Sequence, residues 1–286
     1  RHADHPGRFG CYVEFEPEGR TAVQLRTGIS FVDLEGASNN LKEEVEKPFG
    51  WDFEAVRSHN RECWDDLLGR VEIQCCDALE KTRFYTNMYR SLSSRNTFSD
   101  VDGRWSDQFR VIRTLEDPDA RAMGCDAFWN TFWNLNQLWN LATPEWSSRW
   151  VKSQMAMYRA NGWLAKGPAG MTYIPVMVAE HEIPLMVSAY QMGIRDYDPE
   201  AVFEAVRHQQ MVPGQRIGAG FAGNRDLAPY LEYHYVPADK GAFSNTMEYS
   251  YDDWTVAQLA RALGKDEDDR YFSDRGGWWK NAMNPE

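Results

Sequence analysis

Hydrophobic residues recur at helical spacing through most of the chain beyond residue 50, and polar stretches rich in Gly, Pro and Asp separate them. Val256, Leu259 and Leu263 form one such core-facing stripe. The pattern predicts helices at residues 52–68, 77–94, 125–141, 146–160, 174–192, 199–210, 246–263 and about 266–282. The longest predicted loops are residues 99–118, 165–172 and 213–241. This rhythm predicts a mainly α fold, in which the helices form a toroid or solenoid.

The first part of the chain has a different pattern. Residues 11–16 alternate between apolar and polar side chains, and residues 22–32 are rich in β-forming residues, so both are predicted strands. A short helix is expected at residues 41–46, ended by Pro48. So few strands do not make a domain alone, and we expect their partner strands to lie upstream of this chain.

These patterns divide the chain into three parts. Residues 1–34 are interpreted as the last strands of an N-terminal β-domain, and residues 35–70 as a helical linker. Residues 71–286 are interpreted as the first part of a helical domain. Because neither end resembles a natural terminus, we expect an internal fragment of a longer protein.

The charge of the chain narrows the class of partner. Its 43 acidic and 31 basic residues give a formal net charge of -12. This argues against a nucleic acid, because phosphate binding needs a basic surface. No apolar run is long enough to span a bilayer. The five cysteines form no CxxC pair, so we predict unpaired, packed thiols that leave the compartment undecided.

An acidic group marks the start of the predicted helix at residues 246–263. Extended backwards in steps of four residues, its apolar stripe meets Asp252 and then Glu248, and Asp253 follows directly. Like charges four residues apart on a helix repel each other. Carboxylates on the inward face at a helix start therefore indicate a ligand or metal site. The alternative is a solvated first turn.

A second ionisable group is Glu180, His181 and Glu182, within the apolar stretch 174–187. A helix that is apolar all round is buried, so these residues are poorly solvated in this interpretation. Pro184 cannot donate to the carbonyl of Glu180, which predicts an opened backbone there. The alternatives are a surface patch at a helix bend or a histidine satisfied in the core. No HExxH motif supports zinc-protease chemistry.

Amides and indoles gather in the predicted helix at residues 125–141. Asn130, Asn134 and Gln137 would form one stripe, flanked by Trp129 and Trp133. Amides can hydrogen-bond sugar hydroxyls, and an indole offers the flat apolar face that a sugar ring needs. Structural amides that pin neighbouring loops are an equal alternative.

The segment at residues 161–170 has no phosphate-loop spacing. It could present Trp163 and Lys166 at the mouth of a pocket, or it could be an ordinary loop.

Several motifs, in order along nearly the whole chain, resemble those of glycoside hydrolase family 92. They are Gly28-Ile29-Ser30-Phe31-Val32, Glu35-Gly36-Ala37, Asn40-Leu41, Phe84-Tyr85-Thr86-Asn87-Met88-Tyr89-Arg90, Trp129-Asn130-Thr131-Phe132, Gly162-Trp163-Leu164, Asp239-Lys240 and Glu248-Tyr249-Ser250-Tyr251-Asp252-Asp253-Trp254. The resemblance implies a calcium-dependent, inverting exo-α-mannosidase. It implies a β-sandwich followed by an (α/α)6 toroid, and secretion or export to the periplasm.

The resemblance also implies where the chemistry lies. The general acid, the base and the calcium ligands are expected after Glu286, so no catalytic or metal-binding residue is assigned here, and this chain alone is expected to be inactive. The remainder of the polypeptide is then an obligatory partner. The predicted substrate contacts are Trp129, Asn130, Trp163, Glu180, His181, Glu182, Glu248, Asp252 and Asp253.

This chain departs from the family motif Trp-Asp-Thr-Phe-Arg, because Asn130 and Trp133 replace its acid and its arginine. Some contacts to mannose hydroxyls must therefore differ. The favoured substrate is the end of an N-glycan or mannan, with α-1,2 linkages. Two alternatives remain: a phosphodiesterase of the same family that removes mannose-1-phosphate caps, and a sugar-binding fragment without catalysis.

Overall fold

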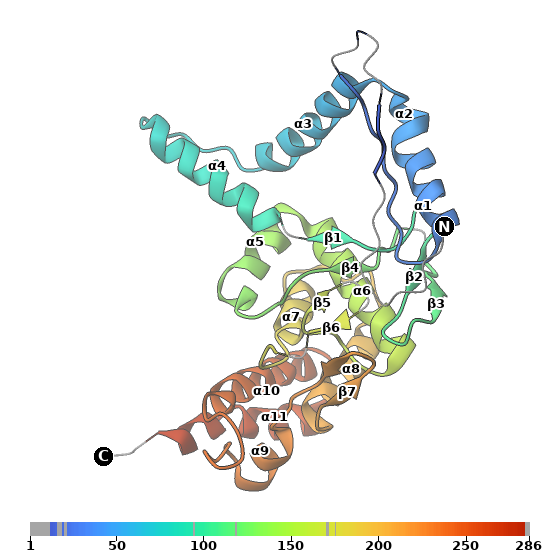
Figure 1. The fold of residues 1–286 in the computed structure, drawn as a ribbon. Helices are drawn as coiled ribbons and strands as arrows, with labels where there is room; N and C mark the ends of the chain where they lie inside the picture. Colours follow the sequence, from blue (N-terminus) through green and yellow to red (C-terminus); the bar gives the residue numbers. More distant parts are fainter. Residues whose placement is uncertain are drawn as a thin grey trace.

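The computed structural model describes residues 12–15, 19, 22–93, 95–117, 119–169, 172–174 and 176–283. These residues are mainly α-helical with four short two-stranded sheets, which confirms the predicted mainly α fold. Figure 1 shows an upper arm that contains α1 to α4 and a lower body that contains the later helices. No helix in the described part of the chain is both long enough and apolar enough to cross a membrane.

The arm begins with a nearly continuous helical rod and ends with two longer helices. Its elements are α1 (Leu34–Leu41), a π-helical segment (Lys42–Glu46), α2 (Lys47–Phe49), α3 (Phe53–Gly69) and α4 (Ala78–Leu92). Asp52 and Asp77 cap α3 and α4 by accepting hydrogen bonds from the first-turn amides of Ala55 and Leu79. These two predicted helices are therefore confirmed almost to the residue.

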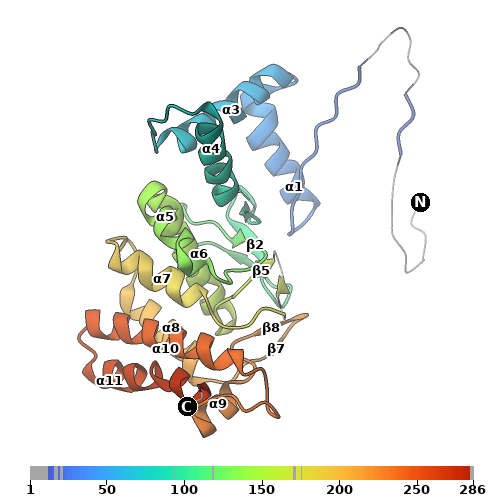
Figure 2. The ribbon, with the colours of Figure 1, turned by 90° about the vertical axis from the view of Figure 1, so that its left-hand side faces the viewer.

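The body consists of helices joined by short hairpins. Its helices are α5 (Leu135–Ala142), α6 (Pro144–Asn161), α7 (Glu182–Gln191), α8 (Pro199–Met211), α9 (Leu227–Tyr233), α10 (Ser244–Ala262) and α11 (Asp266–Arg275), with 3-10 turns at Thr131–Trp133 and Trp278–Ala282. Figure 2 shows these helices stacked in successive layers. The antiparallel pairs are β1 (Asn96–Thr97) with β4 (Met123–Gly124), β2 (Arg104–Ser106) with β3 (Ile112–Thr114), β5 (Pro168–Ala169) with β6 (Thr172–Tyr173), and β7 (Gln215–Ile217) with β8 (Gly220–Ala222).

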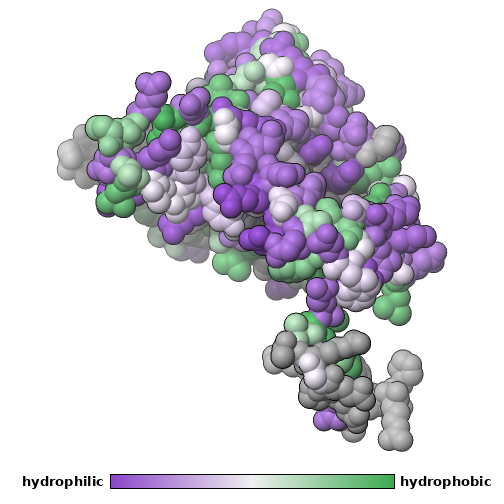
Figure 3. Space-filling model, turned by 90° about the horizontal axis from the view of Figure 1, so that it is seen from above, coloured by the Kyte–Doolittle hydropathy of each residue, from purple (hydrophilic) through white to green (hydrophobic). Residues whose placement is uncertain are grey.

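The main core lies between α5, α6, α7, α8 and α10. Val256 and Leu259 of α10 are fully buried in it, and Leu263 packs against its edge, as the apolar stripe predicted. Ile183 and Met186 of α7 belong to the same cluster. Seen from above, the surface is mostly hydrophilic, with hydrophobic residues in separate small patches (Figure 3). The main core therefore joins these helices, and two smaller clusters of buried residues lie beside it.

Three sequence predictions about secondary structure are wrong. Residues 22–32 form no strand, and the described residues 12–15 form none either. None of the strands in the described part of the chain pairs with them. The predicted helix at 125–141 begins only at Leu135, since the amides of Cys125 and Phe128 bond to carbonyls of the segment 166–168. The division into three domains stays a prediction.

The third error concerns residues 174–192. The helix there starts at Glu182, so Glu180 and His181 precede it. Pro184 lies in the first turn, where its missing N–H would have no helical partner, and it opens no helix at Glu180. Elsewhere, α1 starts seven residues before the predicted short helix because the side chain of Asp33 caps it, and the helical rod continues past Pro48.

The described cysteines are unpaired, as predicted, but most are not packed. Cys125 is buried, whereas Cys63, Cys75 and Cys76 are exposed. The predicted loop at residues 213–241 also contains structure, namely the β7–β8 hairpin and α9. Gly, Pro and Asp spacing marked these turns but did not reveal the short elements between them.

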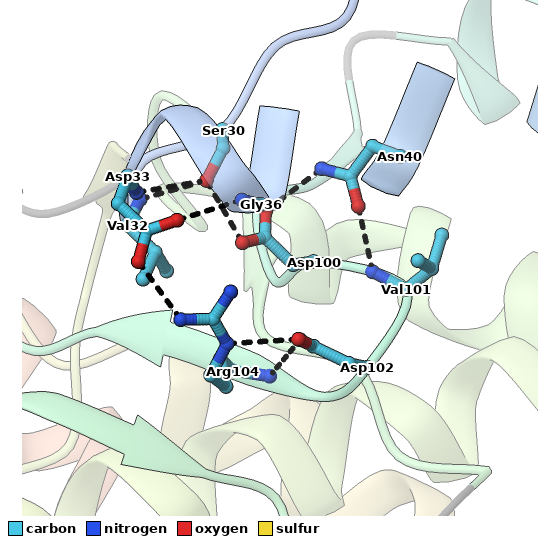
Figure 4. A network of polar contacts seen from close by, with 9 residues as sticks. All are labelled: Ser30, Val32, Asp33, Gly36, Asn40, Asp100, Val101, Asp102 and Arg104. Carbon is cyan, nitrogen blue, oxygen red and sulfur yellow. Dashed lines mark hydrogen bonds and ion pairs between the residues drawn. The ribbon is translucent and has the colours of Figure 1, made fainter. Parts of the chain in front are cut away.

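A buried carboxylate joins the arm to the body (Figure 4). Asp100 accepts one hydrogen bond from the Ser30 hydroxyl and one from the Asn40 amide, both at 2.8 Å. The side-chain oxygen of Asn40, Oδ1, accepts a hydrogen bond from the backbone amide of Val101 at 2.9 Å. A Cβ atom at Gly36 would collide with Asp100. Ser30, Gly36 and Asn40 all belong to the family-like motifs, so these motifs build a structural clasp.

A surface ion pair network extends the clasp. Arg104 Nη1 lies 2.9 Å from Asp33 and its Nε lies 2.8 Å from Asp102. Asp33 also caps α1 through the amide of Gly36 at 2.6 Å. These exposed pairs add less than the buried Asp100 contacts, because water screens them.

We predict that Asn40→Asp destabilises the protein. The change removes the donor to Asp100 and places two carboxylates together in a buried site, so the free energy of unfolding should fall by about 3 kcal/mol at neutral pH. Urea denaturation measures this. Asn39→Asp, a neighbour in α1 with the same change of charge, is the control. Equal losses in the two variants would contradict the proposed role of the clasp.

Candidate functional site

Two ionisable groups far apart in sequence meet in the body. Glu248 and Asp252 lie on the inward face of α10, and Glu180 and His181 lie in the turn before α7. His181 Nε2 is 3.0 Å from Glu248 Oε2, and Asp252 Oδ2 accepts the amide of Glu180 at 2.9 Å. The structure thus brings the two predicted acidic groups together, with an imidazole between them.

The backbone of Asn130 fixes the state of His181. Its amide N–H donates to His181 Nδ1 at 3.0 Å, so Nδ1 is an acceptor and the proton resides on Nε2, which donates to Glu248. Burial lowers the pKa of His181, but the hydrogen bond to Glu248 and the charges of Asp252, Glu248 and Glu180 outweigh it and raise the pKa. Protonating Nδ1 would break the bond to Asn130, so this geometry needs the neutral ring.

A lysine and a glutamine hold Glu180 in the interior. Lys166 Nζ lies 3.3 Å from Glu180 Oε1, and Gln209 Nε2 donates to Glu180 Oε2 at 2.6 Å. Lys166 also donates to the carbonyl of Gly223 at 3.0 Å. All the side chains of this group are buried. A buried charge is tolerated only with such partners, so Lys166 is a necessary part of the site.

Glu182 is buried without a cation of its own. Gln209 Nε2 lies 3.3 Å from Glu182 Oε1, and Glu182 Oε2 has no partner among the described residues. Burial, followed by the charge of Glu180, raises the pKa of Glu182 well above its ordinary value. Glu182 therefore holds its proton more firmly than an exposed glutamate does. The two glutamates that flank His181 thus have different surroundings, since only Glu180 contacts Lys166.

Two residues next to His181 adopt left-handed backbone conformations. Ala179 and Asn130 both have φ of 62°. A residue such as Ala179 pays roughly 1–2 kcal/mol for this conformation, which asparagine adopts more readily. Ala179 directly precedes the Glu180 amide that bonds Asp252, and Asn130 supplies the amide that bonds His181. Strain is therefore concentrated where the imidazole is held, as is common at functional sites.

Aromatic rings continue from His181 to the surface. The Phe132 ring lies 4.7 Å from the His181 ring and stacks on Tyr251 at 4.2 Å, between centroids. Tyr251 in turn stacks near Trp254 at 5.8 Å. Trp254 is 48% exposed and Trp129 is 50% exposed. These open faces suit a sugar ring, whose C–H groups pack on aromatic rings.

Sequence reasoning missed several of these residues. Phe132 and Tyr251 were not selected, although Tyr251 lies three residues after Glu248 on the same helix and so shares its side. Gln209 gave no signal, because it reaches the site from α8. For Lys166 the sequence left open a pocket mouth or an ordinary loop, and neither indicated its buried contact with Glu180.

Asp253 lies apart from this group. Its carboxylate forms a two-pronged ion pair with the fully buried Arg275, at 2.8 and 3.0 Å, and the Tyr230 hydroxyl lies 2.8 Å from Oδ2. Arg275 also donates to the carbonyl of Gln210 at 2.9 Å. These contacts join α8 to α11, so Asp253 has a structural role here. Its predicted contact with substrate stays untested.

The other predicted residues are divided between core and surface. Trp163 is only 4% exposed and packs in a core cluster against the ring of His208. Its predicted contact with a sugar stays untested. Asn130 lies next to His181, but Asn134 and Gln137 are exposed, and they form no helical stripe with it because residues 125–134 are not α-helical. The predicted amide stripe is therefore wrong.

We tested whether the described residues fit a calcium ion. No three His, Cys, Asp or Glu side chains among them are arranged to hold a metal. The carboxylate of Glu180 already forms an ion pair with the ammonium group of Lys166. Calcium requires several oxygen ligands. The described residues do not fit calcium, and its ligands after Glu286 stay a prediction.

Comparison with known proteins points to one family. A model of the glycosyl hydrolase family 92 catalytic domain matches residues 36–286. A fungal protein of Arthroderma benhamiae, described as an uncharacterized secreted glycosidase, is 25% identical over 94% of this chain.

Solved structures give the same result. An inverting mannosidase of family GH92 from Bacteroides thetaiotaomicron superposes with a TM-score of 0.78 and 26% identity over 88% of this chain. An α-mannosidase of that family from the same organism gives 0.77 and 28% identity over 90% of this chain. A structure of that α-mannosidase in complex with mannoimidazole is also similar, with a TM-score of 0.76.

This chain spans about a third of each of these relatives: 32% of the fungal protein and 34% and 33% of the two bacterial mannosidases. Activity belongs to those longer proteins, so the activity associated with this chain must be inferred.

We predict that Asp252 makes stability depend on pH. Burial raises the pKa of Asp252 to about 7. Between about pH 4 and 7 the folded chain keeps a proton that the unfolded chain releases, so stability falls as pH rises, by at most about 1.4 kcal/mol per pH unit. Asp252→Asn cannot titrate. As the pH rises through this range, its free energy of unfolding, measured by urea denaturation, should increase relative to that of the wild type.

Asp239→Asn serves as the control, because Asp239 is exposed and its replacement should give a difference that does not vary with pH. If the free energy of unfolding of Asp252→Asn differs from that of the wild type by an amount that is equally independent of pH, Asp252 titrates as an ordinary aspartate.

Proposed function

We propose, because this chain belongs to glycosyl hydrolase family 92, that the protein containing it is an α-mannosidase that releases terminal mannose from glycans. The observation that carries the proposal is the His181–Glu248 pair, held at 3.0 Å beside exposed aromatic rings. A carboxylate that can accept hydroxyl hydrogens, next to flat apolar faces, is the usual chemistry of a sugar site.

Glu248 is suited to binding a sugar hydroxyl. Its side chain is 23% exposed, and only Oε2 is engaged by a described residue, namely His181. The other oxygen can accept a hydrogen bond from substrate. Because His181 donates through Nε2 and is fixed by Asn130, it orients the Glu248 carboxylate. Of the predicted contacts, Trp129 offers a half-exposed indole, and it directly precedes Asn130, whose amide bonds His181.

This chain's residues would bind and orient mannose, while the bond cleavage needs two further carboxyl groups. In an inverting enzyme one carboxylic acid protonates the glycosidic oxygen, and a carboxylate activates water on the opposite face, roughly 6.5–9.5 Å away. Both are proposed to lie after Glu286. Calcium is proposed to assist by binding mannose hydroxyls through ligands that also lie there. Inversion is the stereochemistry named for one bacterial relative.

The proposed substrates are α-1,2-linked mannose ends of N-glycans or mannans. We propose an extracytoplasmic location, which the description of the fungal relative as secreted supports. The remainder of the polypeptide is the proposed partner, because this chain would contribute to a site completed by it.

The full-length protein tests this function. Incubated with α-1,2-mannobiose, it should release mannose that NMR first detects as the β-anomer, because inversion of an α-linkage gives the β-product. Removal of calcium by a chelator should abolish release, and added calcium should restore it. Absence of mannose release would contradict the function, early α-mannose would contradict inversion, and activity that resists chelation would contradict the role of calcium.

We predict that Glu248→Gln in the full-length protein lowers kcat/KM on α-1,2-mannobiose at least about tenfold. The amide keeps the size of the side chain but loses the charge that strengthens a hydrogen bond to a sugar hydroxyl. Steady-state kinetics measure the loss. Glu267→Gln, at the exposed start of α11, makes the same chemical change away from the site. If the two variants keep equal activity, Glu248 does not contact the substrate.

A further inference from the structure

A pocket with mainly apolar walls lies where the arm meets the body. It has a volume of about 210 Å³. Its walls come from α3 and the end of α4 in the arm, and from β1, β4, α5 and α6 in the body (Figure 1). It is lined by Trp64, Trp139, Trp146 and Trp150, together with Arg95 and several smaller side chains. None of the residues predicted to contact substrate lines it.

Arg95 is the one charged side chain among the described residues that line the pocket. Its guanidinium carbon lies 4.5 Å from the centre of the Trp139 ring, and its Nη1 donates to the carbonyl of Ser93 at 3.1 Å. Its Nε is buried and has no hydrogen-bond partner among the described residues. A guanidinium carries five N–H donors, so Arg95 is held in place and keeps donors to spare.

Arg95 also has no counterion in contact with it among the described residues. Burial lowers the pKa of Arg95, and the charges of Cys125 and Asp126 offset this only in part, without a hydrogen bond to either group. The Asp126 side chain is exposed and accepts the amide of Ala127 instead. A cation that is partly buried without an opposite charge is costly. An anion placed in this pocket would therefore be stabilised by Arg95.

The walls of the pocket decide which kind of anion fits. Phosphate and sugars need several polar partners, whereas most of this lining is aromatic or aliphatic. A carboxylate can accept two parallel hydrogen bonds from a single guanidinium, and an apolar ring attached to it would pack on the indoles. Ligand pockets usually measure roughly 300–1,000 Å³, so this smaller one suits a small molecule better than a peptide or a glycan.

We propose that this pocket binds a small carboxylic acid that carries an apolar ring. The carboxylate would pair with Arg95, and the ring would lie among the four tryptophans. Because Trp64 belongs to α3, the ligand would also join the arm to the body. None of the α3 residues is fully buried, and one ion pair, between Arg70 and Glu145, links this helix to α6. The proposal does not depend on the proposed function.

Calorimetry on the full-length protein tests the proposal with phenylacetate and its neutral analogue phenylacetamide. Phenylacetamide has nearly the same shape without the charge, so it should bind at least about tenfold more weakly than phenylacetate. Arg95→Gln should raise the Kd for phenylacetate by a similar factor. The same variant should leave the Kd for phenylacetamide nearly unchanged, because that probe forms no ion pair.

Arg149→Gln is the matched control. Arg149 also stacks on a tryptophan, with its guanidinium carbon 4.5 Å from the centre of the Trp146 ring, but it does not line the pocket. This variant should bind phenylacetate as the wild type does. Trp64→Leu keeps Arg95 and removes the ring that α3 contributes, so it should weaken the binding of both probes.

Three results would overturn the proposal: no binding of phenylacetate at about 10 mM, equal Kd values for the two probes, or unchanged phenylacetate binding in Arg95→Gln. If Arg95→Gln does not fold, the comparison of the two probes in the wild type and in Trp64→Leu decides. A wild type that does not bind phenylacetate, with a less stable Arg95→Gln variant, would show that a carboxylate of the same polypeptide pairs with Arg95. That result would overturn the proposal as well.

Discussion

The hydrogen bond from the Glu180 amide to the buried Asp252 carboxylate holds the site together. It joins the turn before α7 to the inward face of α10 at 2.9 Å. Ala179 can remain in its left-handed conformation because this contact and the surrounding core determine the path of the turn. His181, which directly follows Glu180, is then directed at Glu248. The position of the imidazole therefore depends on a carboxylate that it does not touch.

The acidic residues in this interior are stabilised in different ways. These differences distinguish a residue that can bind a ligand from residues that hold the structure. Glu180 has a lysine and Asp253 has an arginine. Glu182 has no cation beside it, and burial and Glu180 raise its pKa well above the ordinary value. Glu248 alone remains partly open to solvent. A carboxylate that is paired inside the protein is held in place, because losing its partner would leave a buried charge, whereas one that is left partly open is available to a ligand.

Sequence patterns predicted those features that depend on local rules. Aspartates that cap helices and an apolar stripe on α10 gave most helices and the inward position of Asp252. They failed at residues 125–134, where backbone amides bond to a distant hairpin and Asn130 turns left-handed. The contact of Lys166 with Glu180 has no local signature, since residues from different segments form it. Long-range hydrogen bonds decided each of these cases.

The buried guanidinium of Arg275 has a consequence for how the last third of the chain unfolds. It is bonded to α8 through the Gln210 carbonyl and to α10 through Asp253, and Tyr230 brings α9 to the same point. Separating α10 from α11 would leave a buried charge without its counterion, and separating α8 or α9 would remove a hydrogen bond from this buried ion pair. Residues 199–275 should therefore open as a single cooperative unit, with amide hydrogens in all four helices exchanging at closely similar rates.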